Sequence, residues 1–438
     1  MVPLFIGLLL FAFVLFSDEA HMLKGKIHYG GRGILHPERR SRSDLRHSVT
    51  FASKLKNADR LEQILYDVSD PDSPNYGKHW TRAQLGSFLQ NEEGSRRLRE
   101  YLVGEGVTII SATPYDELIT AEASIGTWER VFGTEFHEFV HEDWKGSVMN
   151  RALEYSLSEE INEYVESVFE VADFPAPVFH PSVISPMVST EAAGSNPYPN
   201  FVSPSFLANH YRITPSVAKK NFGSQGILSC IGQMLSPADL AYFQKFFKLP
   251  KQTLTGSTGG HVTNKACQNS LDDCAEANLD VQYITAVGQN ISTYNFYYDN
   301  CDWLQLVKDL LKLSNPPTVL SMSYSSYEAA FSNSFINTFN NAAMQLGVMG
   351  VTLFASSGDD GVSGFATQTT ADCDYSPQFP AANPYITSIG ATQVYFHFLS
   401  NYLFLICFGV GSGVKQTRDH LSSGSGRTNH DWWRILFV

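Results

Sequence analysis

The chain of 438 residues is long enough for two ordinary domains. Its composition, 43% hydrophobic and 17% charged, is that of a globular protein with a large core, and it excludes a mainly disordered chain. The formal net charge of -13 leaves no basic surface to displace the counterions of phosphates, so nucleic acid is excluded as a partner.

Residues 1–20 have the character of a secretory signal peptide. The apolar run from Val2 to Phe16 has the length of a signal sequence and is too short to span a bilayer comfortably. Ser17 and Ala20 follow as small residues suited to cleavage. A buried N-terminal element is the alternative, because no Lys or Arg precedes the run. We expect entry into the secretory pathway, with secretion and delivery to the lysosome both open.

Residues 21–175 predict a separate α+β domain. A periodic helix is expected within 57–70, and a strand at 107–111. The following segment, 176–205, is rich in Pro, Ser, Gly and Ala, which is typical of a linker that proteases cut easily.

Residues 206–393 alternate between strands and helices. A short apolar strand at 226–232 precedes an amphipathic helix that begins with Ser236 as N-cap and Pro237 at the first helical position. Buried strands are expected at 317–325 and 348–358, with a helical period between them. This alternation predicts βαβ units on a parallel sheet.

The tail, residues 394–438, differs in composition from the rest. Its aromatic-rich apolar run at 395–410 is slightly short for a bilayer and contains His397, Ser400 and Asn401, so we expect no stable membrane span.

Cysteine usage fits an oxidising compartment, since none of the six cysteines forms a CxxC zinc pattern. Cys267 and Cys274 are close enough in sequence to bridge a loop, while the other pairings stay open. Asn290, in an Asn-Ile-Ser sequence, is a candidate glycosylation site. The cysteines are Cys230, Cys267, Cys274, Cys301, Cys373 and Cys407.

Two acidic sites stand out in the second half of the chain. Glu276 and Asp280 are four residues apart, so a helix places them on one face, where repulsion favours a shared proton. A solvated helix face is the other interpretation. Asp359 and Asp360 follow the strand at 348–358, where parallel sheets collect functional groups, although an ordinary Asp-Gly turn has the same pattern.

The motifs EANLDVQY and FASSGDDG, behind FASKLKNADRLEQILYDVSDPDSPNYGKHW, resemble the sedolisin family of serine-carboxyl peptidases. The tripeptidyl-peptidase I-like members are the most similar. The resemblance covers 47–171 and 226–393. It implies an α/β subtilisin-like parallel sheet, C-terminally incomplete, preceded by an α+β activation pro-domain. The implied domains are the pro-domain at 21–175 and the N-terminal part of the peptidase domain at 206–393.

The resemblance also implies roles for the acids. Glu276 matches the glutamate that serves as general base, and Asp280 matches the aspartate that holds it. Asp359 matches the protonated acid that donates to the oxyanion, which explains activity in acid. Asp360 stands where the family usually has Ser, and it receives no role. The implied partners are a peptide or protein substrate and the chain's own pro-domain.

The family's nucleophile lies in a Gly-Thr-Ser motif, which this sequence lacks. Ser412 and Ser425 are flanked by Gly but do not carry the motif, and His261 is expected to be a loop histidine rather than a base. The family's calcium site is also not found here, and no other cofactor is expected. We therefore expect a peptidase by lineage that is inactive as written. The alternative is a secreted, non-catalytic relative that acts as a binding or inhibitory protein.

Overall fold

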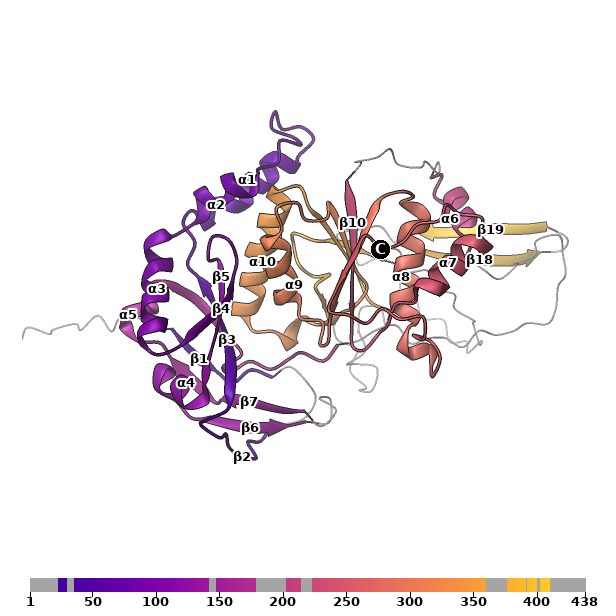
Figure 1. Cartoon of the computed structure of the whole chain (residues 1–438). Coiled ribbons are helices and arrows are strands. Elements are labelled where there is room, and N and C mark those ends of the chain that lie inside the picture. The colour runs from indigo at the N-terminus through magenta and orange to yellow at the C-terminus, as the bar shows by residue number, and fades with distance from the viewer. Residues whose placement is uncertain are drawn as a thin grey trace, which may run out of the picture.

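The computed structural model describes residues 23–29, 35–141, 147–178, 202–213, 223–359, 376–390, 392–399 and 402–409, the last two ranges by their backbone only. The predicted signal peptide and most of the predicted linker lie outside these residues. Within them, no helix has both the length and the apolar character needed to cross a bilayer. The chain forms an N-terminal domain, up to residue 178, and a parallel-sheet domain, from residue 202 onward (Figure 1).

The N-terminal domain is built on an antiparallel sheet of four strands, and it confirms the predicted mixture of helices and strands. Helices α3 and α4 pack on this sheet, since Leu98, Trp128 and Phe132 share a core with Phe51. In spatial order the strands are β4 (Thr108–Ala112), β5 (Leu118–Ser124), β3 (Arg46–Ser53) and β9 (Val165–Phe169), and the helices are α3 (Glu92–Gly104) and α4 (Ile125–Phe132).

Smaller elements complete this domain. A three-stranded sheet and a two-stranded sheet border the main one. Helix α2 begins with a capping box, in which Thr81 accepts from the amide of Gln84 and Gln84 accepts from that of Thr81. The remaining elements are β1 (Lys24–Lys26), β2 (Arg39–Arg40), η1 (Ala58–Arg60), α1 (Leu61–Ser69), α2 (Arg82–Leu89), β6 (Phe136–Val140), β7 (Val148–Ala152), β8 (Glu154–Ser156) and α5 (Glu159–Asn162).

The parallel-sheet domain contains the predicted βαβ architecture. All neighbouring strands of its six-stranded sheet run parallel. In spatial order they are β11 (Gly256–Thr258), β12 (Ser292–Tyr298), β10 (Ser224–Cys230), β13 (Val319–Met322), β15 (Thr352–Ser356) and β17 (Thr387–Ile389).

Helices cover both faces of this sheet, as Figure 1 shows. On one side lie α6 (Pro204–His210), α7 (Pro237–Phe246) and α8 (Ala275–Val287), and on the other α9 (Trp303–Lys312) and α10 (Asn333–Val348). The hydroxyl of Ser236 accepts from the amide of Asp239 at 3.1 Å and Pro237 begins α7, which confirms the predicted helix start.

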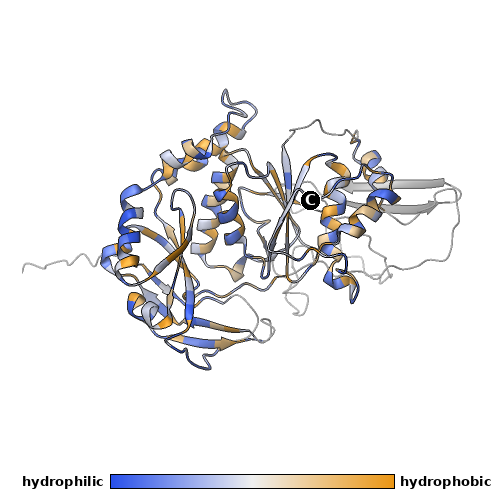
Figure 2. Ribbon diagram, viewed as in Figure 1, coloured by the Kyte–Doolittle hydropathy of each residue, from blue (hydrophilic) through white to orange (hydrophobic). Residues whose placement is uncertain are grey.

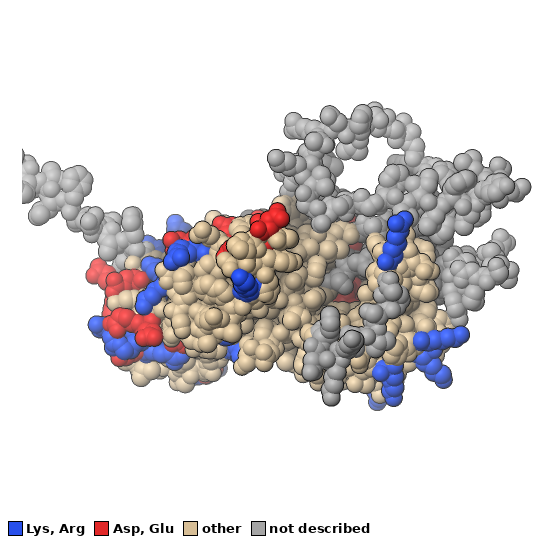
Figure 3. Space-filling view, turned by 90° about the horizontal axis from the view of Figure 1, so that it is seen from above, with Lys and Arg blue, Asp and Glu red and all other residues tan. Residues whose placement is uncertain are grey.

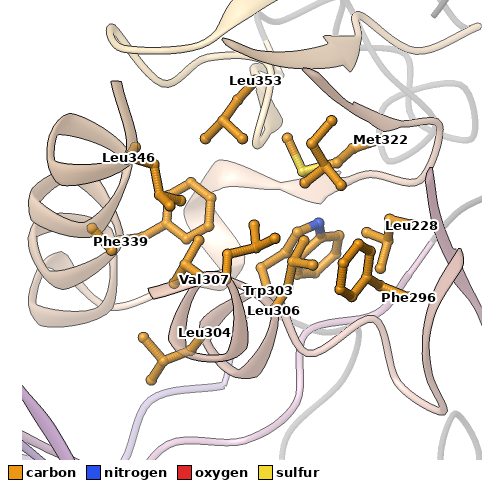
Figure 4. Close-up of a cluster of buried hydrophobic side chains, with 14 of the residues drawn as sticks. Leu228, Phe296, Trp303, Leu304, Leu306, Val307, Met322, Phe339, Leu346 and Leu353 are labelled. Atoms are coloured by element: carbon orange, nitrogen blue, oxygen red, sulfur yellow. The ribbon is translucent and has the colours of Figure 1, made fainter. Parts of the chain in front are cut away.

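Successive side chains of β10 point to opposite faces and join different cores. Ile227 packs with Ala277 and Val281 of α8, whereas Leu228 packs with the side chains of α9 and α10. Figure 4 shows this second core, with Trp303 and Phe339 among its labelled residues. Apolar and polar residues alternate along the helices (Figure 2), as expected for helices that bury one face.

The N-terminal domain packs against α9 and α10. Leu61 and Leu85 share a core with Met344 and Val348 of α10. Polar bonds cross the same interface, since Lys308 donates to the hydroxyl of Thr120 at 2.8 Å. Seen from above, the acidic side chains in view lie mainly over the N-terminal domain (Figure 3).

The last described elements lie near the start of the predicted tail. The backbone forms an antiparallel pair of strands, β18 (Thr392–Leu399) and β19 (Tyr402–Gly409). A separate short antiparallel pair is formed by β14 (Ser326–Tyr327) and β16 (Gln378–Phe379). The rest of the tail, including Ser412 and Ser425, lies outside the described residues.

Candidate active site

The acid pair lies at the start of α8, and both carboxyl groups are buried. Glu276 is 5% exposed and Asp280 is 8% exposed, so the interpretation as a solvated helix face is wrong. Their side chains form a hydrogen bond to each other, and the hydroxyl of Ser323 donates to Oδ1 of Asp280 at 2.8 Å. Ser323 follows β13, so a helix and a strand end together hold the pair.

Burial raises the pKa of both carboxyl groups. For Glu276, burial is the largest cause of its raised pKa, followed by the charge of Asp280 and the hydrogen bond between them. Burial also raises the pKa of Asp280, while the hydrogen bonds from Ser323 and Glu276 lower it. The two carboxyl groups therefore share a proton at a pH at which isolated carboxyl groups are ionised.

Asp359, on a third element, lies close enough to Glu276 for their charges to interact. It follows β15 after Gly358, whose φ of +89° is a left-handed conformation that favours glycine. The charge of Asp359 further raises the pKa of Glu276, which indicates that the two carboxyl groups lie near each other. Asp360 lies outside the described residues.

Tyr324 and Ser323 are site residues that the sequence analysis missed. Tyr324 is fully buried, and burial together with the charges of Asp280 and Glu276 raises its pKa well above the usual range. Both residues directly follow β13, and the general rule that functional groups collect at the carboxyl ends of parallel strands was the available signal.

Two disulfides hold the surroundings of α8. Cys267 bonds to Cys274, as the sequence spacing suggested, and Cys274 directly precedes the helix. Cys230 bonds to Cys301 and so joins the carboxyl ends of β10 and β12, a pairing that the sequence did not indicate.

The other candidate residues lie apart from the pair. His261 lies in a loop, with its ring stacked on Tyr297 at a centroid distance of 3.6 Å. Asn290 is exposed in the turn between α8 and β12. Among the residues that the structure describes, no group of three or more His, Cys, Asp or Glu side chains is arranged to hold a metal ion.

A cavity of about 540 Å³ lies between the two domains. The N-terminal domain contributes Arg151, Glu170 and Asp173 to its wall, and the parallel-sheet domain contributes Asp302 and Trp303. Burial raises the pKa of Asp173 and of Asp302. The cavity is thus an acidic, partly apolar part of the domain interface, separate from the acid pair.

Comparisons with known proteins identify a matching domain model and similar proteins. The model of the pro-kumamolisin activation domain matches residues 37–174. Tripeptidyl-peptidase 1 of Rattus norvegicus is 28% identical over 370 residues, which cover 79% of this chain and 61% of that protein. Tripeptidyl-peptidase 1 of Homo sapiens is 26% identical over 376 residues, with the same coverage. The chain therefore spans about 61% of the length of these relatives.

Among solved structures, Pseudomonas sedolisin, a serine-carboxyl proteinase complexed with pseudo-iodotyrostatin, is similar with a TM-score of 0.34 at 19% identity, covering 45% of this chain and 55% of that one. The epidermin leader peptide processing serine protease of Staphylococcus aureus gives a TM-score of 0.37 at 10% identity, covering 80% and 70%.

The protein is thus an α/β protein with a parallel sheet that follows an α+β activation domain. Over residues 37–174 it matches the pro-kumamolisin activation domain, and over most of its length it is similar to tripeptidyl-peptidase 1 proteins.

Proposed function

We propose that this protein is, by lineage, an acid serine-carboxyl peptidase of the tripeptidyl-peptidase type that acts on peptides and proteins. The observation that carries the proposal is the buried pair of Glu276 and Asp280, with the charge of Asp359 acting on Glu276. Two carboxyl groups that share a proton in a buried site have no structural benefit on an ordinary helix, because their burial is costly.

In the proposed mechanism, Glu276 takes the proton of an attacking hydroxyl, and Asp280 holds Glu276 in place through their hydrogen bond. Ser323 fixes the carboxylate of Asp280 from the other side. Asp359 donates to the oxyanion and must be protonated to do so, which favours acidic conditions. The N-terminal domain would be the chain's own partner as its activation domain.

We further propose that the chain as written does not hydrolyse peptides. The printed sequence contains no Gly-Thr-Ser motif, so Glu276 has no hydroxyl of the family's kind to activate. The second candidate function, a secreted non-catalytic binding or inhibitory protein, is favoured by the same observation. Calcium stays an expectation of the family alone, without a site proposed in this chain.

The test is an activity assay on residues 21–438 at roughly pH 3.5 to 5, where carboxyl groups near their ordinary pKa share protons, with a tripeptide-amide reporter. We expect no turnover. Turnover that is lost in Glu276→Gln would show that a nucleophile exists and would overturn the proposed inactivity.

A second measurement separates the two candidates. Sequencing the transcript across the codon of Gln393 would support the peptidase lineage if a longer form continues into a Gly-Thr-Ser segment. Inhibition of an active tripeptidyl-peptidase by this chain, without turnover, would support the binding protein.

A further inference from the structure

The turn after β10 has an unusual backbone. Ile231 has a φ of +50° and Gly232 a φ of +81°. The left-handed region is unfavourable for a β-branched residue such as isoleucine, so the surrounding structure must hold it there. The amide of Ile231 donates to the carbonyl of Asp299 at 3.1 Å, and the amide of Gly232 donates to the hydroxyl of Tyr297 at 2.9 Å.

The turn places Gln233 against the start of α8. Gln233 is only 2% exposed, and its Oε1 accepts from the amides of Glu276 at 3.1 Å and of Ala277 at 3.5 Å. Its Nε2 donates to the carbonyl of Asp272. Cys274, the residue before the helix, makes no side-chain cap. Gln233 therefore supplies, from the loop after β10, the cap that the sequence next to α8 lacks.

We propose that Gln233 is a positioning residue that fixes Glu276 in the orientation in which it shares a proton with Asp280. This rests on the proposed role of Glu276 as the base. A buried amide without a hydrogen-bond acceptor costs free energy. The start of α8 is therefore held in the position in which Gln233 accepts from its amides. The strain at Ile231 is then part of how the site is held.

The effect acts through position rather than charge, because Gln233 is neutral. The titratable groups around Glu276 are Asp280, Asp359 and Tyr324, and none of them changes when Gln233 is replaced.

The test compares Gln233→Met, which keeps the size of the side chain and loses the acceptor, with Gln233→Glu, which keeps an acceptor. Gln233→Glu is compared by amide exchange alone, because its carboxyl group adds a third acid to the titration. Asn278→Leu is the matched control. Asn278 is 6% exposed on the same helix start, and its Oδ1 accepts from Ser236 at 2.9 Å without contacting the amide of Glu276. Two quantities are measured: the rate of amide exchange, and the titration of ¹³C-labelled carboxyl groups. The carboxyl signals are assigned with the variants Glu276→Gln and Asp280→Asn.

In Gln233→Met we expect the amides of Glu276 and Ala277 to exchange at least about tenfold faster. We also expect a smaller difference in pH between the two titration steps of Glu276 and Asp280. This difference exceeds about one pH unit only while the two carboxyl groups interact strongly. Gln233→Glu should keep the slow exchange, and Asn278→Leu should keep the wild-type difference. An unchanged difference in Gln233→Met, or the same loss in Asn278→Leu, would overturn the proposal.

If Gln233→Met does not fold, amide exchange in the wild-type protein still tests the proposal. The amide of Glu276 should exchange about as slowly as that of Asn278, which donates to the carbonyl of Cys274 at 3.0 Å within the helix. Exchange at the rate of a free amide would overturn the proposal. Since no turnover is needed, a negative result here is distinct from a failure of the proposed function.

Discussion

Replacement of Glu170 by glutamine is the perturbation with the clearest expected effect on the domain interface. Glu170 directly follows β9 and faces the cavity between the domains, where its carboxylate accepts from the amide of Thr50 at 3.0 Å. Burial raises its pKa from 4.5 to about 8, and the charges of Asp173 and Asp302 add to this. Glutamine has the same shape and still accepts from Thr50.

The raised pKa of Glu170 determines how the stability of the fold changes with pH. The folded protein holds the proton of Glu170 more tightly than the unfolded chain does, so this stabilisation is fully present below about pH 4.5 and is lost as the pH rises through about 8. The difference between these values corresponds to roughly 5 kcal/mol as an upper limit. Because Asp173 shares the same surroundings, we expect about 2–3 kcal/mol for Glu170 alone.

The assay is urea unfolding of wild type and Glu170→Gln at pH 4.5, 6 and 8. We expect nearly equal stability at pH 4.5 and a variant that is more stable by about 2–3 kcal/mol at pH 8, since glutamine has no proton to lose. Glu166→Gln, an exposed position on the same strand, is the control and should follow wild type. If Glu170→Gln loses stability with pH as steeply as wild type, the reasoning is wrong.

Three further predictions concern other parts of the molecule. Ser323→Ala removes a hydrogen bond that lowers the pKa of Asp280, so the first deprotonation of the acid pair should move to higher pH in a ¹³C titration; an unmoved curve would contradict this. Arg82→Met should lower the free energy of unfolding by about 3–5 kcal/mol, because it leaves the buried carboxylate of Glu117 without its partner at 2.6 Å, and adding Glu117→Met should recover much of the loss in the same urea assay. Limited proteolysis should cut first within 176–205, whereas preferred cuts inside 50–170 would contradict the predicted linker.

The sequence was most informative where a pattern is local. The spacing of Glu276 and Asp280 predicted one helix face, and Ser236 with Pro237 predicted a helix start, because both depend only on neighbours along the chain. The parallel sheet followed from continuous apolar runs, such as the one that contains β15.

The rest depends on tertiary contacts that no local pattern encodes. Strand β12 reads STYNFYY and mixes polar with aromatic residues, so it lacks the continuous apolar run of a buried strand. Gln233 reaches the amide of Glu276 across 43 positions of sequence, and Ser323 reaches Asp280 across another 43. These residues come together only when the strands of the parallel sheet pair.

The stretch of chain that follows β13 connects the acid pair with the end of the N-terminal domain. Ser323 donates to Asp280, and three residues later the hydroxyl of Ser326 donates to the carbonyl of Pro177. The N-terminal domain itself packs on α9 and α10, on the face of the sheet opposite to α8. The segment at 175–178 is therefore connected by hydrogen bonds to the strand end that holds the acid pair, apart from the broad helical interface.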